Sequence, residues 1–229
     1  MSDPRITRGL ERQLDERRAL LQSGRRPFGW KAGFGAPASL DRFALDGPLV
    51  GFMTDASVLD DGAAVDITGW GRSVAEPEIF VVLGADLTPG GGELATGASI
   101  ASVGPAIELA NIDPSPDDVE EILAGNIFHE AVILGVPDPD RSGADLTGLE
   151  GRVRVDGEEV VATSRLEDLT GRLVDVLSHL SILLDDHGEL MRAGEVVICG
   201  SIVPPIDLAA GMTVEFELHP MRPISVTVR

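Results

Sequence analysis

Two glutamates, Glu76 and Glu78, stand two positions apart where the apolar run 79–83 begins. Such a run is typical of a buried strand, and on a strand residues i and i+2 point to the same face. The two carboxylates are therefore expected side by side at the edge of an apolar core, where they need a cation between them or raised pKa values. A hard divalent ion such as Mg²⁺ or Mn²⁺ prefers oxygen ligands of this kind. A strand start in contact with water explains the same pair, and the residue types alone leave both interpretations open.

A third glutamate, Glu108, is the only charged residue in the apolar stretch 100–111. A buried glutamate needs a partner. Glu108 is thus a natural third oxygen ligand beside Glu76 and Glu78. A core glutamate in a salt bridge is the alternative.

Lys31 lies among aromatic residues and glycines in the segment 28–35. A buried lysine suits proton transfer because burial disfavours its charged form. Glycines also let the backbone approach a ligand closely, and Gly33 is a candidate for such a contact. A lysine at the end of an edge strand, with its ammonium group in water, is the simpler interpretation.

Composition narrows the classes of function. The chain has 229 residues and a net charge of −20, which argues against nucleic acid and anionic membranes as partners. An anionic substrate would need a local positive site. No run approaches membrane-spanning length, and the first residues show no signal peptide. The single cysteine, Cys199, fits a reducing compartment, so we expect a cytoplasmic protein.

Apolar periodicity predicts the elements around these residues. Residues 1–24 are expected to form a helical appendage, and residues 25–229 a single domain. A helix start is expected at 115–118, a hairpin around Asp156 and Gly157, and a strong helix over 173–184. Cys199 is expected in the core.

Four segments of the chain resemble the fumarylacetoacetate hydrolase superfamily, in its branch of 2-oxopent-4-enoate hydratases and 4-oxalocrotonate decarboxylases. They are 29–33 (Gly-Trp-Lys-Ala-Gly), 76–79 (Glu-Pro-Glu-Ile), 105–108 (Pro-Ala-Ile-Glu) and 194–201 (Gly-Glu-Val-Val-Ile-Cys-Gly-Ser), the last followed by Pro204 and Pro205. The likeness covers roughly residues 25–228, and its specific part is the glutamate pair with the third glutamate downstream.

The resemblance implies an α+β fold with a mixed β-roll or barrel-like core and a few flanking helices. It implies Mg²⁺ or Mn²⁺ held by Glu76, Glu78 and Glu108, with Lys31 assisting proton transfer. It also implies a homo-oligomer. Four residues are expected to contact the substrate on the same grounds: Gly33, Asn126, Gly200 and Ser201.

Three functions fit this resemblance. The first is a metal-dependent hydratase that adds water to 2-hydroxypenta-2,4-dienoate-type substrates in aromatic meta-cleavage catabolism. The second is a decarboxylase or C–C hydrolase of a related 2-oxo acid such as 4-oxalocrotonate. The third is a non-catalytic partner subunit of an active homologue.

The chain departs from the branch at three places. Phe34, Gly35 and Ala36 stand where threonine or serine is usual, and Ile, Phe and His fill 127–129 after Asn126. Bulky and charged residues at 164–168 replace a run of glycine and alanine, and we expect them to reshape or fill part of the pocket. Arg165 in that segment could instead bind a substrate carboxylate, since guanidinium binds carboxylate in a bidentate manner.

Overall fold

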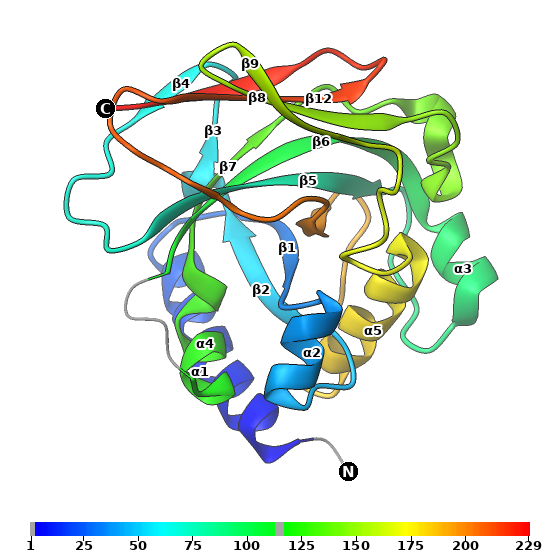
Figure 1. The fold of residues 1–229 in the computed structure, drawn as a ribbon. Coiled ribbons are helices and arrows are strands. Elements are labelled where there is room, and N and C mark those ends of the chain that lie inside the picture. Colours follow the sequence, from blue (N-terminus) through cyan, green and yellow to red (C-terminus); the bar gives the residue numbers. More distant parts are fainter. Residues whose placement is uncertain (1–2, 113–116) are drawn as a thin grey trace.

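The computed structural model describes residues 3–112 and 117–229, which fold around two mixed β-sheets (Figure 1). The larger sheet has the strand order β2-β1-β10-β5-β6-β7-β3, with β11 added beside β5. The smaller sheet has the order β4-β13-β12-β8-β9 and lies over one side of the larger one, where β12 contacts β6. This agrees with the predicted α+β fold, in which a curled mixed sheet carries few helices.

The strands are β1 (Pro27–Gly33), β2 (Leu49–Thr54), β3 (Val58–Leu59), β4 (Ala63–Val65), β5 (Ser73–Leu83), β6 (Ile100–Asn111), β7 (His129–Leu134), β8 (Glu150–Val155), β9 (Glu158–Thr163), β10 (Val196–Ser201), β11 (Ile206–Asp207), β12 (Thr213–His219) and β13 (Ile224–Val228). The helices are α1 (Pro4–Gln22), α2 (Pro37–Phe43), α3 (Gly92–Ala98), α4 (Val119–Ala124) and α5 (Leu173–Asp185), with short 3₁₀ turns at Asp55–Ser57, Asn126–Phe128 and Pro139–Ala144.

The two faces of the larger sheet differ in character. Ile79 and Val81 of β5 share the main apolar core with Phe216 of β12. Because side chains alternate along a strand, the intervening positions of β5 point to the opposite face, and these include Glu76 and Glu78. The alternation therefore separates the packing face of the sheet from a face that carries carboxylates.

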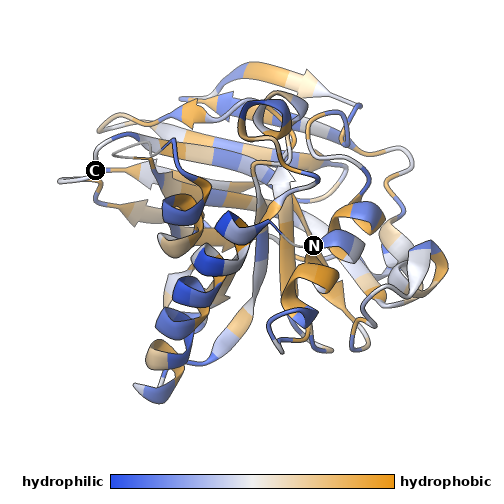
Figure 2. Ribbon diagram, turned by 90° about the horizontal axis from the view of Figure 1, so that it is seen from below, coloured by the Kyte–Doolittle hydropathy of each residue, from blue (hydrophilic) through white to orange (hydrophobic). Residues whose placement is uncertain are grey.

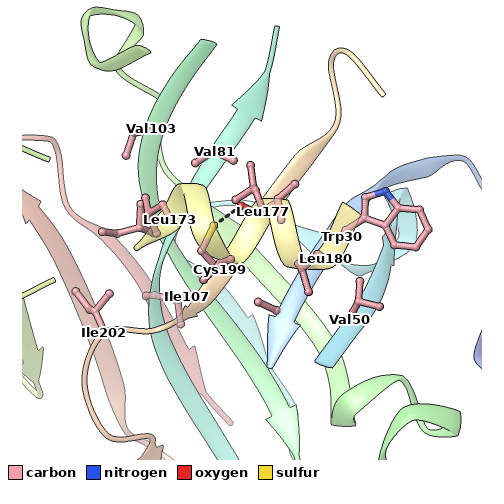
Figure 3. Packing of buried hydrophobic residues seen from close by; sticks show 14 of the residues in the cluster. Trp30, Val50, Val81, Val103, Ile107, Leu173, Leu177, Leu180, Cys199 and Ile202 are labelled. Carbon is pink, nitrogen blue, oxygen red and sulfur yellow. Dashed lines mark hydrogen bonds between the residues drawn. The ribbon is translucent and has the colours of Figure 1, made fainter. Parts of the chain in front are cut away.

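Helix α5 completes the main core. Its Leu173, Leu177 and Leu180 pack in the same cluster as Val81 and Trp30, as Figure 3 shows. Cys199 lies in this core as expected, and its thiol donates a hydrogen bond to the Val197 carbonyl.

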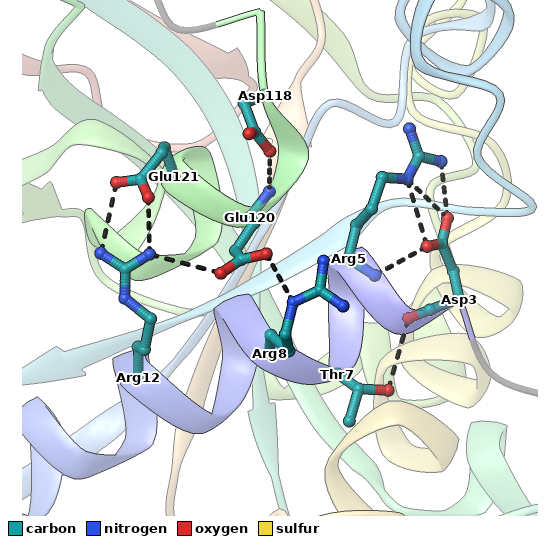
Figure 4. Close-up of polar contacts among 8 residues, drawn as sticks. All are labelled: Asp3, Arg5, Thr7, Arg8, Arg12, Asp118, Glu120 and Glu121. Carbon is teal, nitrogen blue, oxygen red and sulfur yellow. Dashed lines mark hydrogen bonds and ion pairs between the residues drawn. The ribbon is translucent and has the colours of Figure 1, made fainter.

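Helix α1 packs along α4 and is joined to it by ion pairs. Arg8 Nε lies 2.7 Å from Glu120 Oε2, and Arg12 Nη1 lies 2.6 Å from Glu121 Oε1 (Figure 4). Figure 2 shows the long hydrophilic stretches of α1. Its other side is buried, where the Gln13 amide donates hydrogen bonds to the carbonyls of Val50 and Leu123. The predicted appendage is thus a helix with one side in the core.

The predicted start of α4 is only partly covered by the structure. Ser115 and Pro116 lie outside the described residues, and the helix begins at Val119 with Asp118 as its N-cap. The predicted hairpin is β8–β9, and the predicted strong helix is α5. Among the helices in the described ranges, none has both the length and the apolar character to cross a membrane.

Candidate active site

Three glutamates meet on the face of the larger sheet that carries carboxylates. Glu76 and Glu78 lie within β5, and Glu108 lies on β6 directly opposite Glu76 in the antiparallel pair. One carboxylate oxygen from each residue lies within 4.8 Å of the other two. The sheet thus brings together the three residues predicted as metal ligands.

The hydrogen bonds within the glutamate cluster do not reach all of its carboxylate oxygens. Glu78 Oε2 accepts a hydrogen bond from the Gly200 amide at 2.8 Å. Glu78 Oε1 and Glu108 Oε2 are buried and have no hydrogen-bond partner among the described residues. A buried polar atom without a partner costs free energy. Two such oxygens beside a third carboxylate match the donor set of a hard divalent cation.

Burial and mutual repulsion shift the pKa values of these carboxyl groups. Burial raises the pKa of Glu76 to about 7, with the charge of Glu108 adding to the shift. Burial and the neighbouring carboxylates also raise the pKa of Glu78 well above its ordinary value. Burial opposes ionisation of Glu108 too, but Lys31 and His129 outweigh it, so the pKa of Glu108 is lowered. Glu108 is thus the carboxylate that stays ionised without a metal.

Lys31 lies inside the sheet, because β1 runs between β2 and β10. Only 1% of the residue is exposed, which excludes the edge-strand interpretation. Its ammonium group contacts Glu108 Oε1 and donates to the Ile127 carbonyl at 3.1 Å. A Cβ at Gly51 on β2 would come within 2.8 Å of Lys31 Cγ, so glycine there leaves room for the lysine.

His129, which the sequence analysis noted only as part of a departure from the family pattern, is a member of the cluster. Its Nδ1 lies 2.7 Å from Glu108 Oε1, and its Nε2 lies 3.0 Å from Ser57 Oγ. His129 is the first residue of β7, which pairs with β6. A histidine 21 positions after Glu108 carries no local signal, so only the strand pairing reveals the contact.

The cluster opens onto a cavity of about 430 Å³. Lys31, Glu76 and Glu78 line it. Three predicted substrate contacts also lie in its wall: Gly33, Gly200 and Ser201. The departures from the family pattern at 34–36 and 127–128 line the cavity as well.

Comparison with known proteins extends the likeness seen in the sequence. No family model matches the chain. A 2-hydroxyhexa-2,4-dienoate hydratase from Comamonas testosteroni is 28% identical over 89% of this chain and 79% of that protein. A 4-oxalocrotonate decarboxylase from a Pseudomonas species is 24% identical over 90% of this chain and 80% of that protein.

Solved structures give the same result for the fold. The 4-oxalocrotonate decarboxylase of Pseudomonas putida G7, complexed with magnesium and adipate, superposes with a TM-score of 0.89 at 24% identity, over 98% of this chain and 86% of that one. The fumarylpyruvate hydrolase of Pseudomonas aeruginosa, in complex with Mn²⁺ and pyruvate, gives 0.68 at 14% identity, over 89% of each chain.

In sequence and in fold, the chain is thus similar to proteins of the fumarylacetoacetate hydrolase superfamily. The curated relatives are named as hydratases and decarboxylases, which confirms the predicted branch and the prediction of a lyase-type enzyme. The predicted fold class is confirmed by the solved neighbours.

Two of the predicted substrate contacts do not lie in the cavity. The Asn126 amide accepts from the Phe52 backbone N–H at 2.8 Å and donates to the Phe52 carbonyl at 2.9 Å. Both of its polar groups are therefore used to hold β2. Residues 126–128 all have positive φ values (49°, 52° and 62°), and Asn126 fixes this strained segment, from which the Ile127 carbonyl reaches Lys31.

Arg165 is the second predicted substrate contact that lies outside the cavity. It is exposed and pairs with Asp168 at 3.1 Å, and none of the residues 164–168 lines the cavity. The bulky segment expected to fill part of the pocket therefore lies outside it, and only Leu169 and Thr170 after it reach the wall. The arginine that does line the cavity is Arg72, which the sequence analysis missed although it stands four positions before Glu76.

Proposed function

We propose that the chain is a divalent-metal-dependent lyase of 2-hydroxydienoic and 2-oxo acids, with hydration of 2-hydroxypenta-2,4-dienoate-type substrates as its leading activity. The observation that carries the proposal is the pair of buried oxygens without partners, Glu78 Oε1 and Glu108 Oε2, beside Glu76 at the cavity wall. The hydratase relative from Comamonas testosteroni supports the choice of reaction.

Glu76, Glu78 and Glu108 would hold Mg²⁺ or Mn²⁺, and both ions occur in solved structures with this fold. When bound, such an ion polarises the 2-oxo group of a substrate as a Lewis acid. The Gly200 amide keeps Glu78 oriented toward the cluster. Gly33, Gly200 and Ser201 would border the substrate from the cavity wall.

Lys31 is proposed to hold and move the proton. Its contact with Glu108 places an ammonium group beside the carboxylates, and Lys31 also lines the cavity. Hydration adds a hydroxyl group to one carbon of the substrate and a proton to another, with no net oxidation or reduction. A proton donor fixed at the inner end of the cavity meets this requirement.

Decarboxylation of a related 2-oxo acid is the second candidate. The curated relatives named as 4-oxalocrotonate decarboxylases support it. Loss of carbon dioxide would use the same polarised 2-oxo group, with a proton delivered to the carbon that the carboxylate leaves. The departures from the family pattern at 127–129 and 164–168 are the reason for a third candidate, a non-catalytic partner subunit. Residues 164–168 lie outside the cavity, whereas Ile127 and Phe128 line it, so only the first departure still supports this role.

The test is turnover after removal and return of metal. The purified protein is treated with chelator, supplied with Mg²⁺ or Mn²⁺, and assayed for loss of the conjugated absorbance of 2-hydroxypenta-2,4-dienoate, with product analysis for added water or released carbon dioxide. Activity that depends on metal and disappears in Glu78→Ala supports the proposal. Absence of metal binding would overturn it. Light scattering of the same sample tests the expected homo-oligomer.

A further inference from the structure

His129 reaches the face of the larger sheet that carries carboxylates because β7 contains a β-bulge. Leu109 of β6 pairs with Ala131 of β7. The next residue along β6, Ala110, pairs with His129, so Glu130 is an extra residue of β7, and it is exposed. Residues directly opposite each other in an antiparallel pair have their side chains on the same face. His129 thus shares the face of Ala110, which lines the cavity.

The bulge decides which side chain of β7 becomes the neighbour of Glu108. In an unbroken ladder, Glu130 would lie opposite Ala110, and His129 would point to the face of the apolar core. A fourth carboxylate would then lie on the face of the three glutamates in place of an imidazole. Bulges next to active sites often redirect a side chain in this way. The local backbone is therefore built to bring His129 to Glu108.

The His129 ring is held at both of its nitrogens. Nδ1 lies 2.7 Å from Glu108 Oε1, Nε2 lies 3.0 Å from Ser57 Oγ, and the side chain is only 3% exposed. Ser57 ends the 3₁₀ turn before β3, and β3 pairs with β7, so this turn lies beside the start of β7. An ionised carboxylate only accepts hydrogen bonds, so Nδ1 is the donor to Glu108. Ser57 thus fixes the orientation in which the ring makes this hydrogen bond.

The two oxygens of Glu108 have different surroundings. Oε1 contacts both Lys31 and His129, whereas Oε2 has no hydrogen-bond partner among the described residues. Lys31 lines the cavity, where the proposed function has it move a proton, so its hold on Oε1 changes during turnover. His129 is not among the residues that line the cavity. Its hydrogen bond is therefore the lasting anchor of Oε1, and Oε2 remains available to a cation.

We propose that His129 is a positioning residue of the metal site, which fixes Glu108 through Oε1 so that Oε2 is presented to the cation. Ser57 supports this role by fixing the ring. The inference rests on the proposed function, because it takes the three glutamates as ligands of Mg²⁺ or Mn²⁺. Hydrogen-bond partners of metal ligands typically contribute about 10- to 100-fold to metal affinity.

The test is calorimetric titration of Mg²⁺ and Mn²⁺ into the full chain after treatment with chelator. His129→Leu should weaken the binding of both ions by about 10- to 100-fold, because Glu108 keeps only its contact with Lys31. His129→Asn should restore part of the affinity, since the amide nitrogen of asparagine is bonded to Cγ, as Nδ1 is, and can donate to Glu108. Ser57→Ala should weaken binding by a smaller factor, because the ring keeps one of its two hydrogen bonds.

A matched control and thermal melts separate positioning from a general effect on the fold. His219→Leu removes a histidine that contacts Glu217 on the smaller sheet, and it should bind both ions as the wild type does. His129→Asn and Ser57→Ala should melt close to the wild-type temperature without metal and still bind metal more weakly. This result would support positioning, because a purely structural role predicts that affinity falls only where the melting temperature falls.

Two results would overturn the inference and leave the proposed metal site intact. They are wild-type affinity in His129→Leu, and an affinity in His129→Asn that is no higher than in His129→Leu. If His129→Leu does not fold, unchanged affinity in Ser57→Ala overturns the inference instead. Failure of the wild-type protein to bind either ion would overturn the inference together with the proposed function.

Discussion

Glu76 of β5 stands directly opposite Glu108 of β6, so a cross-strand pair of the antiparallel ladder consists of two carboxylates. Like charges in such a pair are destabilising. Lys31 offsets part of the repulsion by its contact with Glu108, and His129 adds a hydrogen bond to the same oxygen. No corresponding partner reaches Glu78 Oε1 among the described residues. The remaining unfavourable charge is what a bound cation would neutralise.

Glu78→Gln should weaken Mg²⁺ and Mn²⁺ binding by more than about 100-fold, beyond the effect typical of outer-shell partners. The metal-free variant should melt at the wild-type temperature or above, because a buried carboxyl group with a raised pKa is replaced by a neutral amide. Calorimetric titration and thermal melts measure the two effects. Glu93→Gln, at an exposed partner of Arg172, is the control. Unchanged metal affinity in Glu78→Gln would exclude Glu78 as a ligand.

Metal affinity should increase as pH rises from 6 to 8. The raised pKa of Glu76, about 7, and that of Glu78, well above its ordinary value, mean that both carboxyl groups must lose protons to bind a cation. Affinity is measured across this range in wild type and in Glu76→Gln, in which the dependence should flatten. A pH-independent affinity in the wild type would contradict the assignment.

The stability of the metal-free protein should decrease as pH rises. Above the unfolded pKa of about 4.5, the folded protein still holds protons on Glu76 and Glu78 that the unfolded chain has released. The contribution of these groups to stability is therefore greatest below that pH and is lost as pH rises through the folded values. Chelator-treated protein should melt at a lower temperature at pH 8 than at pH 5.5, and Mg²⁺ should restore more of the loss at pH 8.

Asn126→Ala should destabilise the fold by about 1–3 kcal/mol, because it leaves the N–H and carbonyl groups of Phe52 without their partner. It also frees the segment that presents the Ile127 carbonyl to Lys31, so activity should fall as well. Denaturant unfolding gives the first effect and turnover the second. Asn111→Ala removes a single exposed hydrogen bond to the Gly71 amide and should cost less. Equal effects of the two substitutions would argue against a special role of Asn126.

Removal of residues 1–24 should prevent stable folding, although the sequence predicts them as an appendage. Leu10 and Leu14 are fully buried, and the Arg17 guanidinium lies 4.6 Å from the Trp30 ring centre. Gln13→Ala should cost about 1–3 kcal/mol through the loss of two buried hydrogen bonds. Arg18→Ala, at an exposed pair with Asp15, should have little effect. A soluble, cooperatively folding chain that lacks residues 1–24 would show that the helix is an independent unit.

Local sequence patterns were sufficient to predict helices α1 and α5 and the placement of the two glutamates of β5 on one face. The spacing of apolar residues predicted α1 and α5, and strand alternation predicted that Glu76 and Glu78 share a face. Contacts between residues of strands that are distant in sequence could not be predicted from local patterns. His129 meets Glu108 only because β7 pairs with β6, and Arg165 does not line the cavity because its side chain is exposed and pairs with Asp168. The same alternation rule could have identified Arg72, because it lies an even number of positions before Glu76 and Glu78.

The strand order of the larger sheet determines when the site can form during protein synthesis. Lys31 on β1 and the glutamates of β5 and β6 are joined through β10, which pairs with both β1 and β5 and begins at Val196, long after β6 has ended at Asn111. While the residues between β6 and β10 are being made, a nascent chain therefore holds the carboxylates without the strand that brings the lysine beside them. Any stop before β10 leaves edges of β1 and β5 open to pairing with other chains. The site of this protein is thus completed only after β10 has been made.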